Sequence, residues 1–270
     1  MTLRTNMNAF IHGEEPIKEP VFLKESTSAE QQLADLRALY AEARDAGAPK
    51  ELLVDIERDG KLVDYGIAGE KQLAFELANS HMPLIVIHDL YLEREGLSAQ
   101  IDYLVFTRHI ALVLECKNLY GDITVNDRGD FVRAMRYGGY THREGIYSPI
   151  TQLQRHMELV KQIGADGKGG LTKLGFEHYF DDNYKSLVVL ANPKTILHDR
   201  DAPAAVREKV IRADKLIETV KRMDSESKNS TLTDRELHAW AERWLSRGSE
   251  CPTDYAAQRK AALEEWRKSQ

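Results

Sequence analysis

Three residues near the middle of the chain have side chains suited to metal-assisted chemistry. Asp102 belongs to a run of β-branched and aromatic residues, and Glu115 and Lys117 belong to the next such run. This composition predicts the two strands of a β-hairpin that closes over Arg108 and His109. Carboxylate oxygens are the ligands that Mg²⁺ and Mn²⁺ prefer, and a nearby ammonium stabilises negative charge that develops during a reaction. The three residues therefore predict a divalent-cation site with a cationic side chain beside it.

The register of this hairpin decides whether the three side chains meet. If Thr107 pairs with Ile110, then Asp102 lies directly opposite Glu115. Two carboxylates in that position repel each other unless a cation lies between them. A loop of two or four residues gives this register, whereas a loop of three or five residues shifts it by one and separates the pair. The predicted site therefore depends on the length of the loop.

The direction of each side chain follows from the alternation along a strand. Glu115 and Lys117 share a face with Val113, whereas Cys116 points to the other face. A thiol hydrolase built on Cys116 is therefore disfavoured, because the thiol faces the core side of its strand. A structural alternative stays open, in which Glu115 and Lys117 form a charge pair on an edge strand and Asp102 caps the start of its own strand.

Four motifs, taken in order, resemble the nuclease-related domain, NERD, of the restriction-endonuclease-like PD-(D/E)xK nucleases. The motifs are Gly69-Glu70 on a predicted helix, Ile101-Asp102-Tyr103-Leu104-Val105, Glu115-Cys116-Lys117, and Tyr147-Ser148-Pro149-Ile150-Thr151-Gln152 followed by His156. The resemblance covers about residues 64 to 195. It implies an α/β fold with a restriction-endonuclease-like αβββαβ core, in which helices flank a mixed central sheet, and a metal-dependent nuclease activity.

The resemblance also implies a role for each matching residue. Asp102 and Glu115 would bind Mg²⁺ or Mn²⁺, and Glu70 would supply or support the same metal site. Lys117 would steady the attacking water or the transition state, and Gln152 would bind the substrate phosphate or orient Lys117. An acidic residue in the first turn of a helix also complements the helix dipole without any catalytic role, and for Glu70 this alternative stays open.

A stretch after the hairpin combines cationic and aromatic side chains. Between residues 133 and 147, arginines and tyrosines surround a Gly-Gly pair, a composition typical of nucleic-acid surfaces and also of exposed hairpin tips. With a histidine from the following helix, the candidate substrate-binding residues are Arg133, Arg136, Tyr140, Arg143 and His156. The net charge of −6 argues against indiscriminate binding, since phosphate affinity is largely electrostatic. We expect a nucleic-acid partner, DNA in preference to RNA.

The predicted elements place these motifs on one core with helical extensions at both ends. The nuclease-like core takes residues 61–195, the N-terminal arm and helices take 1–60, and the C-terminal helices take 196–270. Within the core we predict a helix over 66–80, strands over 84–92, 100–107, 110–117, 122–126, 130–137 and 185–191, and a helix that starts at Pro149. The extensions offer surfaces for packing or for contact between copies in a homo-oligomer.

Capping signals predict the helices of the two extensions. These are a helix from Ser28 with Gln31 as capping-box partner, one from Pro49 to near Gly60, one over residues 202–223, one from Thr233 with Glu236 as partner, and a last one from about Asp254. Residues 1–24 carry two prolines and little periodicity, and an extended arm is expected there.

Composition limits the class of protein. Apolar residues make up 42% and charged residues 30%, which fits a globular fold and argues against disorder. No apolar run approaches the roughly 18 residues of a membrane span, and the first residues lack the apolar core of a secretory signal. The lack of such a run means that we expect no membrane partner. With only two cysteines, we also expect no disulfide framework and a cytoplasmic location. A second function stays open, that of a nucleic-acid-binding or protein-interaction module that keeps the fold without turnover.

Overall fold

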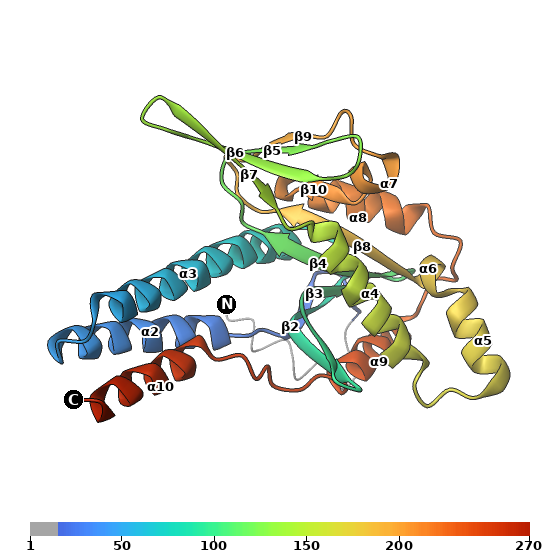
Figure 1. Ribbon diagram of the computed structural model, residues 1–270. Helices are drawn as coiled ribbons and strands as arrows, with labels where there is room; N and C mark the ends of the chain where they lie inside the picture. Colours follow the sequence, from blue (N-terminus) through green and yellow to red (C-terminus); the bar gives the residue numbers. More distant parts are fainter. Residues whose placement is uncertain (1–15) are drawn as a thin grey trace. The chain divides into compact units, whose positions relative to one another are not determined.

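The computed structural model describes residues 16–270, apart from the side chain of Tyr137 (Figure 1). The chain divides into two compact units, each with a core of its own. The sheet unit comprises residues 16–25 and 72–249, and the helical unit comprises residues 26–71 and 250–270. Among the helices of the described residues, none is both long enough and apolar enough to cross a membrane.

A mixed six-stranded sheet forms the centre of the sheet unit. Its strand order is β1-β2-β3-β4-β8-β10, formed by Val21–Lys24, Ile85–Arg94, Leu97–Phe106, Ala111–Lys117, Tyr184–Leu190 and Val210–Arg212. The strands β2, β3 and β4 are antiparallel neighbours, whereas β4 and β8 run parallel, as do β8 and β10 and also β1 and β2. With a helix before β2 and another between β4 and β8, this order confirms the expected αβββαβ core.

Helices cover both faces of this sheet. On one face, α4 (Pro149–Ala165) and α9 (Asp234–Leu245) share a core with Val113 of β4, and α4 crosses the sheet in Figure 1. On the other face, α8 (Leu216–Ser225) and the last turns of α3 pack against Leu112 and Leu114. Because apolar residues cover it on both sides, the strand β4 is a nearly continuous hydrophobic run rather than an alternating one.

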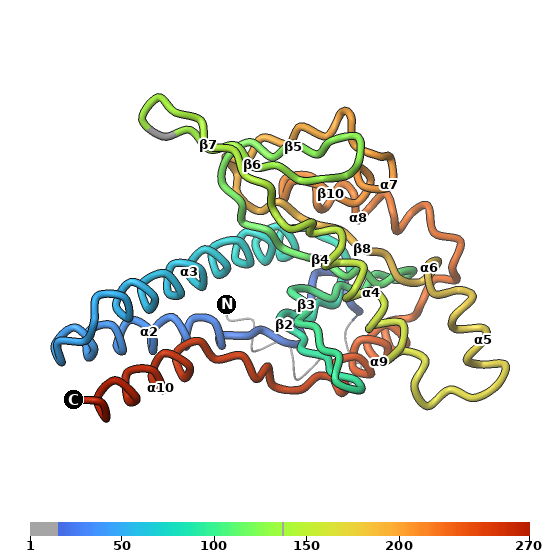
Figure 2. Tube along the Cα trace, in the orientation of Figure 1, coloured from blue at the N-terminus to red at the C-terminus, as the bar shows by residue number. Residues whose placement is uncertain are grey.

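A second sheet has the strand order β7-β6-β5-β9. Its strands are β5 (Asp122–Val125), β6 (Phe131–Tyr137), β7 (Tyr140–Ile146) and β9 (Ile196–His198). The predicted strands over 122–126 and 130–137 are confirmed, and the tip of the β6–β7 hairpin extends away from the rest of the sheet unit in Figure 2. The short helices α5 (Gly170–His178), α6 (Phe180–Asn183) and α7 (Ala204–Arg207) complete this unit.

The β3–β4 hairpin closes through a four-residue loop, the alternative that keeps the expected register. Phe106 pairs with Ala111, and Thr107 N donates to Ile110 O at 2.8 Å. The hydroxyl of Thr107 also accepts from the backbone N–H groups of His109 and Ile110, at 3.2 and 2.9 Å. The Thr107 hydroxyl is therefore the acceptor for two backbone N–H groups of the four-residue loop.

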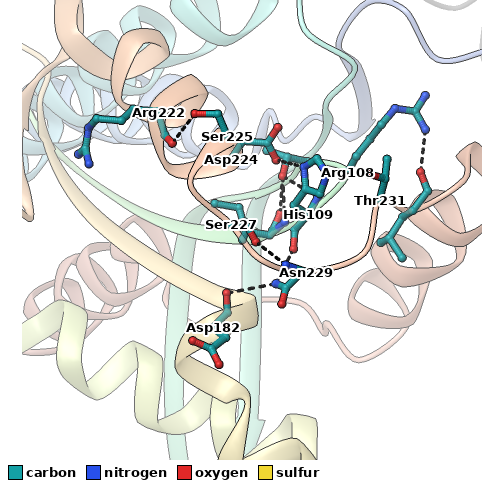
Figure 3. Close-up of polar contacts among 12 residues, drawn as sticks. Arg108, His109, Asp182, Arg222, Asp224, Ser225, Ser227, Asn229 and Thr231 are labelled. Atoms are coloured by element: carbon teal, nitrogen blue, oxygen red, sulfur yellow. Dashed lines mark hydrogen bonds and ion pairs between the residues drawn. The ribbon is translucent and has the colours of Figure 1, made fainter.

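The loop between α8 and α9 holds this turn from outside, as Figure 3 shows. Asn229 Nδ2 donates to His109 O at 2.9 Å, and Leu232 N donates to Arg108 O at 2.9 Å. Arg108 also forms an ion pair with Asp234 at the start of α9. The far end of the hairpin is thus fixed by a segment more than 100 residues away in the sequence.

The helical unit is built from α2 (Ser28–Asp45), the part of α3 (Lys50–Ala78) up to Lys71, and α10 (Tyr255–Lys268). Its core includes Leu36, Leu39, Ile56 and Leu263. A charge cluster joins its two chain segments, because Arg259 donates to Asp59 at 2.6 Å and to Asp55 at 3.1 Å. These contacts connect residues about 200 positions apart, so both ends of the chain contribute to this unit.

Several predicted boundaries are wrong, each for a physical reason. The helix expected to end near Gly60 and the helix expected over 66–80 form one continuous α3, where Gly60 faces Leu33 of α2 and no turn interrupts the backbone. Helix α2 has Thr27 as its N-cap and no side-chain capping bond, so the expected capping box at Ser28 is absent. The helix predicted over 202–223 is divided into α7, β10, a 3₁₀ turn over 213–215 and α8, because Val210 and Ile211 pair with β8.

Other boundary predictions agree with the structure. The capping box of Thr233 and Glu236 is formed, Asp254 caps α10, and Ser148 caps α4 with Pro149 in its first turn. The arm expected over 1–24 is corrected over its last residues, since Val21–Lys24 form the edge strand β1 beside β2. The rest of that prediction, over residues 1–15, lies outside the described residues.

Candidate active site

The predicted register is confirmed, but the ladder ends one pair before the two carboxylates. Tyr103 pairs with Leu114, and Asp102 and Glu115 would follow as the next pair. Instead, Asp102 Oδ2 accepts a hydrogen bond from Cys116 N at 2.6 Å. The expectation that Asp102 lies paired directly opposite Glu115 is thus corrected, because the Asp102 carboxylate binds the backbone N–H that follows Glu115.

The pairing of β3 with its other neighbour, β2, is also interrupted at Asp102. The pairing between β2 and β3 includes His88 with Tyr103 and Leu90 with Ile101 but omits Asp89 and Asp102. Asp89 has a φ of 57°, a left-handed conformation that is strained for a residue with a side chain. Sheet irregularities of this kind re-aim a side chain, and here they lie on both sides of a candidate catalytic carboxylate.

Glu115 and Lys117 point toward α4, as the alternation along β4 predicts. Lys117 Nζ lies 2.7 Å from Glu115 Oε1 and donates a hydrogen bond to Gln152 Oε1 at 2.9 Å. Cys116 lies on the other face and packs against the core that α8 covers. The structure therefore brings Glu115, Lys117 and Gln152 together at the carboxyl end of β4.

His156 completes this cluster beneath Glu115. Its Nδ1 lies 3.1 Å from Glu115 Oε2, close enough for an ion pair, yet the two atoms are not oriented as a hydrogen bond and neither has another partner. Glu115 is only 1% exposed and His156 is 8% exposed. Buried polar atoms without a hydrogen bond are uncommon in native structures, and they often mark functional sites. This pair is therefore a candidate for a functional site.

The electrostatic balance at Glu115 favours its charged form. Burial raises the pKa of the Glu115 carboxyl, but the contacts with His156 and with the Lys117 ammonium outweigh burial, so the pKa lies below its ordinary value. A carboxylate that stays ionised in a buried place is suited to binding a cation. Lys117, in turn, is fixed between two oxygen acceptors.

Local sequence explains why α4 presents these two side chains to β4. The helix begins where Ser148 accepts from Thr151 N and Pro149 fixes the first turn. Gln152 and His156 are four residues apart and so project from one side of the helix. His156 also belongs to the buried stripe formed by Leu153, Leu159 and Val160 at helical spacing, and this stripe was the sequence signal for a buried histidine.

Four of the five candidate substrate-binding residues lie on the β6–β7 hairpin, which belongs to the second sheet. Arg133 forms an ion pair with Glu144, and Arg136 lies 3.7 Å from Asp122. Tyr140 is 84% exposed, and Arg143 is exposed as well. From the pairing register, Arg133 and Tyr140 share one face of the hairpin, whereas Arg136 and Arg143 share the other. His156, the fifth candidate, is buried against Glu115.

Glu70 lies on α3 in the part of that helix that belongs to the helical unit. Its role as a metal ligand stays a prediction. Within residues 16–270, no group of three or more histidine, cysteine or acidic side chains gathers in a metal-binding arrangement. Mg²⁺ commonly takes one or two protein carboxylates and completes its shell with water and substrate oxygens, so the roles of Asp102 and Glu115 as metal ligands also stay predictions.

Comparison with known proteins places this cluster in a family. The family model described as the nuclease-related domain, NERD, matches residues 65–191, and this segment contains β2, β3, β4, α4 and β8. Searches of curated proteins and of solved structures returned no match. The matched segment carries the whole αβββαβ core, in agreement with the restriction-endonuclease-like nucleases. Residues 65–191 of this chain are a nuclease-related domain, NERD.

Proposed function

We propose that this nuclease-related domain is a divalent-metal-dependent nuclease that hydrolyses phosphodiester bonds of DNA. The observation that carries the proposal is the convergence of Glu115, Lys117, Gln152 and His156 at the end of β4. Asp102 joins them through its hydrogen bond to the backbone of Cys116. An ionised buried carboxylate, a second carboxylate and an oriented ammonium are the groups that metal-assisted phosphodiester hydrolysis needs.

The donor set of this cluster fits a hard divalent cation. Glu115 Oε2 is buried and accepts no well-oriented hydrogen bond, although His156 Nδ1 lies 3.1 Å away, so this oxygen keeps capacity to bind a cation. Asp102 and Glu115 would hold Mg²⁺ or Mn²⁺. When bound, such an ion polarises a phosphate oxygen and lowers the pKa of a bound water.

Lys117 would act on the reacting phosphate directly. An ammonium has three N–H donors, and Glu115 and Gln152 accept two of them. The remaining donor would bind a phosphate oxygen or the attacking water, and this hydrogen bond would strengthen as negative charge develops in the transition state. Gln152 would position the ammonium, and His156 would position the Glu115 carboxylate.

The proposal is tested by cleavage of supercoiled plasmid and of a labelled single strand in Mg²⁺, in Mn²⁺ and in EDTA. We expect the wild type to cut only with metal, and Asp102→Asn and Lys117→Ala to lose cutting. Asp127→Asn and Lys228→Ala, at exposed positions away from the cluster, are the matched controls and should cut like the wild type. Intact metal-dependent cutting by Asp102→Asn would overturn the proposal.

One observation favours the alternative of a binding module without turnover. Both oxygens of Glu115 already contact side chains of the protein, Lys117 on one side and His156 on the other. A carboxylate held in this way could be purely structural. Binding of DNA by the wild type without any cutting in Mg²⁺ or Mn²⁺ would support this second function.

A further inference from the structure

Two loops leave the central sheet at the same edge as Lys117 and are fastened to each other. The strands β4 and β8 are parallel, with Lys117 opposite Leu190, so the residues that follow them emerge side by side. Thr195 Oγ1 donates to Leu119 O, and Ile196 N donates to Gly121 O at 3.3 Å. In open α/β sheets, ligands bind beyond the carboxyl ends of the strands. These two loops therefore lie where a ligand is expected.

A cavity of about 210 Å³ lies between these loops and β6. Tyr120, Gly121, Arg136, Lys194 and Ile196 are among the residues that line it. Gly121 has a φ of 108°, and a Cβ at this position would lie 2.5 Å from the carbonyl oxygen of Ala134. Only glycine permits this close approach of the loop to β6, so the wall of the cavity is a built feature of the backbone.

The lining joins exposed apolar surface to an unpaired positive charge. Tyr120 is 46% exposed and Ile196 is 53% exposed, although both are large hydrophobic residues. Lys194 is exposed, and its ammonium forms no ion pair or hydrogen bond within the part of the chain that the structure describes. Arg136 and Asp122 lie 3.7 Å apart and offset each other's charge. The free positive charge of the cavity is therefore that of Lys194.

An aromatic face beside a cation suits a nucleotide, because the ring stacks on a base and the cation binds the phosphate. We propose that this cavity binds one nucleotide of the strand that is cut, with its base against Tyr120 and Ile196 and its phosphate on Lys194. The inference rests on the proposed function for its choice of ligand. The short chain distance from Lys117 to Tyr120 favours a nucleotide of the strand at the cleavage site over a free nucleotide.

Equilibrium binding of a short fluorescent single-stranded oligonucleotide in EDTA tests this inference without any cleavage. Loss of the stacking face in Tyr120→Ala should weaken binding about tenfold, whereas Tyr120→Phe, which keeps the ring, should bind like the wild type. Lys194→Ala should weaken binding about fivefold and lower the slope of log affinity against log salt by about 0.7, the value for one phosphate contact on a single strand. Lys228→Ala, an exposed lysine between α8 and α9, is the control for loss of one charge.

The outcomes separate this inference from the proposed function. Binding that depends on Tyr120 and Lys194 supports the inference even if the wild type does not cut in Mg²⁺ or Mn²⁺, a result that would count against the nuclease alone. If Lys194→Ala and Tyr120→Ala bind the oligonucleotide as tightly as Lys228→Ala does, the inference is wrong. This result would leave the proposed nuclease activity untouched. Failure of the wild type to bind the oligonucleotide overturns it as well.

A competition arm with a nucleoside monophosphate identifies the source of the nucleotide. If the strand is the ligand, the monophosphate should displace the oligonucleotide only at concentrations far above those at which the oligonucleotide itself competes. Equal competition by the monophosphate would assign the cavity to a free nucleotide and overturn the inference. In an active enzyme, Lys194→Ala should raise KM about fivefold, because Lys194 binds a substrate phosphate in the proposed complex.

Discussion

The β3–β4 hairpin has a histidine–carboxylate pair at each end, and the two pairs differ in how well they are satisfied. At the turn, His109 Nδ1 is hydrogen-bonded to Asp224 Oδ1 at 3.0 Å and Nε2 to Thr231 Oγ1 at 2.9 Å (Figure 3). At the open end, His156 Nδ1 and Glu115 Oε2 are 3.1 Å apart but form no hydrogen bond. A histidine and a carboxylate therefore have different surroundings at the two ends of one hairpin.

Under the proposed function, the pair at the turn serves the fold and the pair at the open end serves the reaction. A polar network with every member satisfied stabilises the fold, and the network at the turn ties two distant segments together. A buried pair that the protein leaves unsatisfied has no such effect, and it persists where binding or catalysis uses it. From this contrast we expect substitutions at the turn to change mainly stability and substitutions at the open end to change mainly activity.

Lys117→Ala is expected to have the largest effect of all. Removing one donor that stabilises developing charge lowers kcat by about a hundredfold to a thousandfold. Lys117→Met, which keeps the length of the side chain without its charge, should lose the same activity. Initial rates of cleavage with saturating Mn²⁺ provide the measurement, and circular dichroism confirms that both variants are folded. A kcat within threefold of the wild type would show that Lys117 serves the fold alone.

His109→Leu should produce the largest loss of stability among these predictions. It removes two side-chain hydrogen bonds and leaves the half-buried Asp224 without its histidine, which together cost about 2 kcal/mol in free energy of unfolding. Urea denaturation of the purified protein measures the change. The cleavage rate of the folded fraction should stay that of the wild type, because the turn lies at the opposite end of the hairpin from Lys117. A loss of activity without a loss of stability would reverse the assignment of the two ends.

Local patterns in the sequence were sufficient for the hairpin and for the start of α4. Two strand-forming runs around Arg108 and His109 predicted the register, and Pro149 predicted the helix that carries Gln152. Local patterns were insufficient where pairing with a distant segment decides the secondary structure. Val210 and Ile211 read locally as part of a helix, but pairing with β8 makes them a strand.

The site itself shows the same limit. From its motif His156 was predicted to bind substrate, whereas its contact with Glu115 depends on how α4 packs across β4. Likewise, the end of the ladder before Asp102 depends on the side-chain bond to Cys116 N, which competes with strand pairing and has no signature in a single strand. Residue types at the site were therefore predictable, and their individual partners were not.

Thr233→Ala sharpens the comparison at the turn end, because Thr233 caps the helix whose first residue pairs with Arg108. Loss of the capping box should lower the free energy of unfolding by about 1 kcal/mol. Ser28→Ala is the comparison variant, since the Ser28 hydroxyl contacts Ser26 and caps no backbone N–H of α2, so its substitution should change stability less. Equal losses in the two variants, measured by urea denaturation, would show that the cap contributes nothing beyond ordinary helix propensity.

His156→Leu should have a smaller effect on stability than His109→Leu, although His156 is the more deeply buried of the two histidines. Leucine fills a similar volume and no well-oriented hydrogen bond to His156 Nδ1 is broken, but the buried Glu115 carboxylate loses the contact on its second oxygen. We expect a loss of about 1 kcal/mol, about half of that for His109→Leu, which also breaks two hydrogen bonds. The cleavage rate should nevertheless fall, since Glu115 loses the side chain against its second oxygen. If His156→Leu instead destabilises the protein as much as His109→Leu does, then the pair at the open end is satisfied in solution and the contrast between the two ends of the hairpin does not hold.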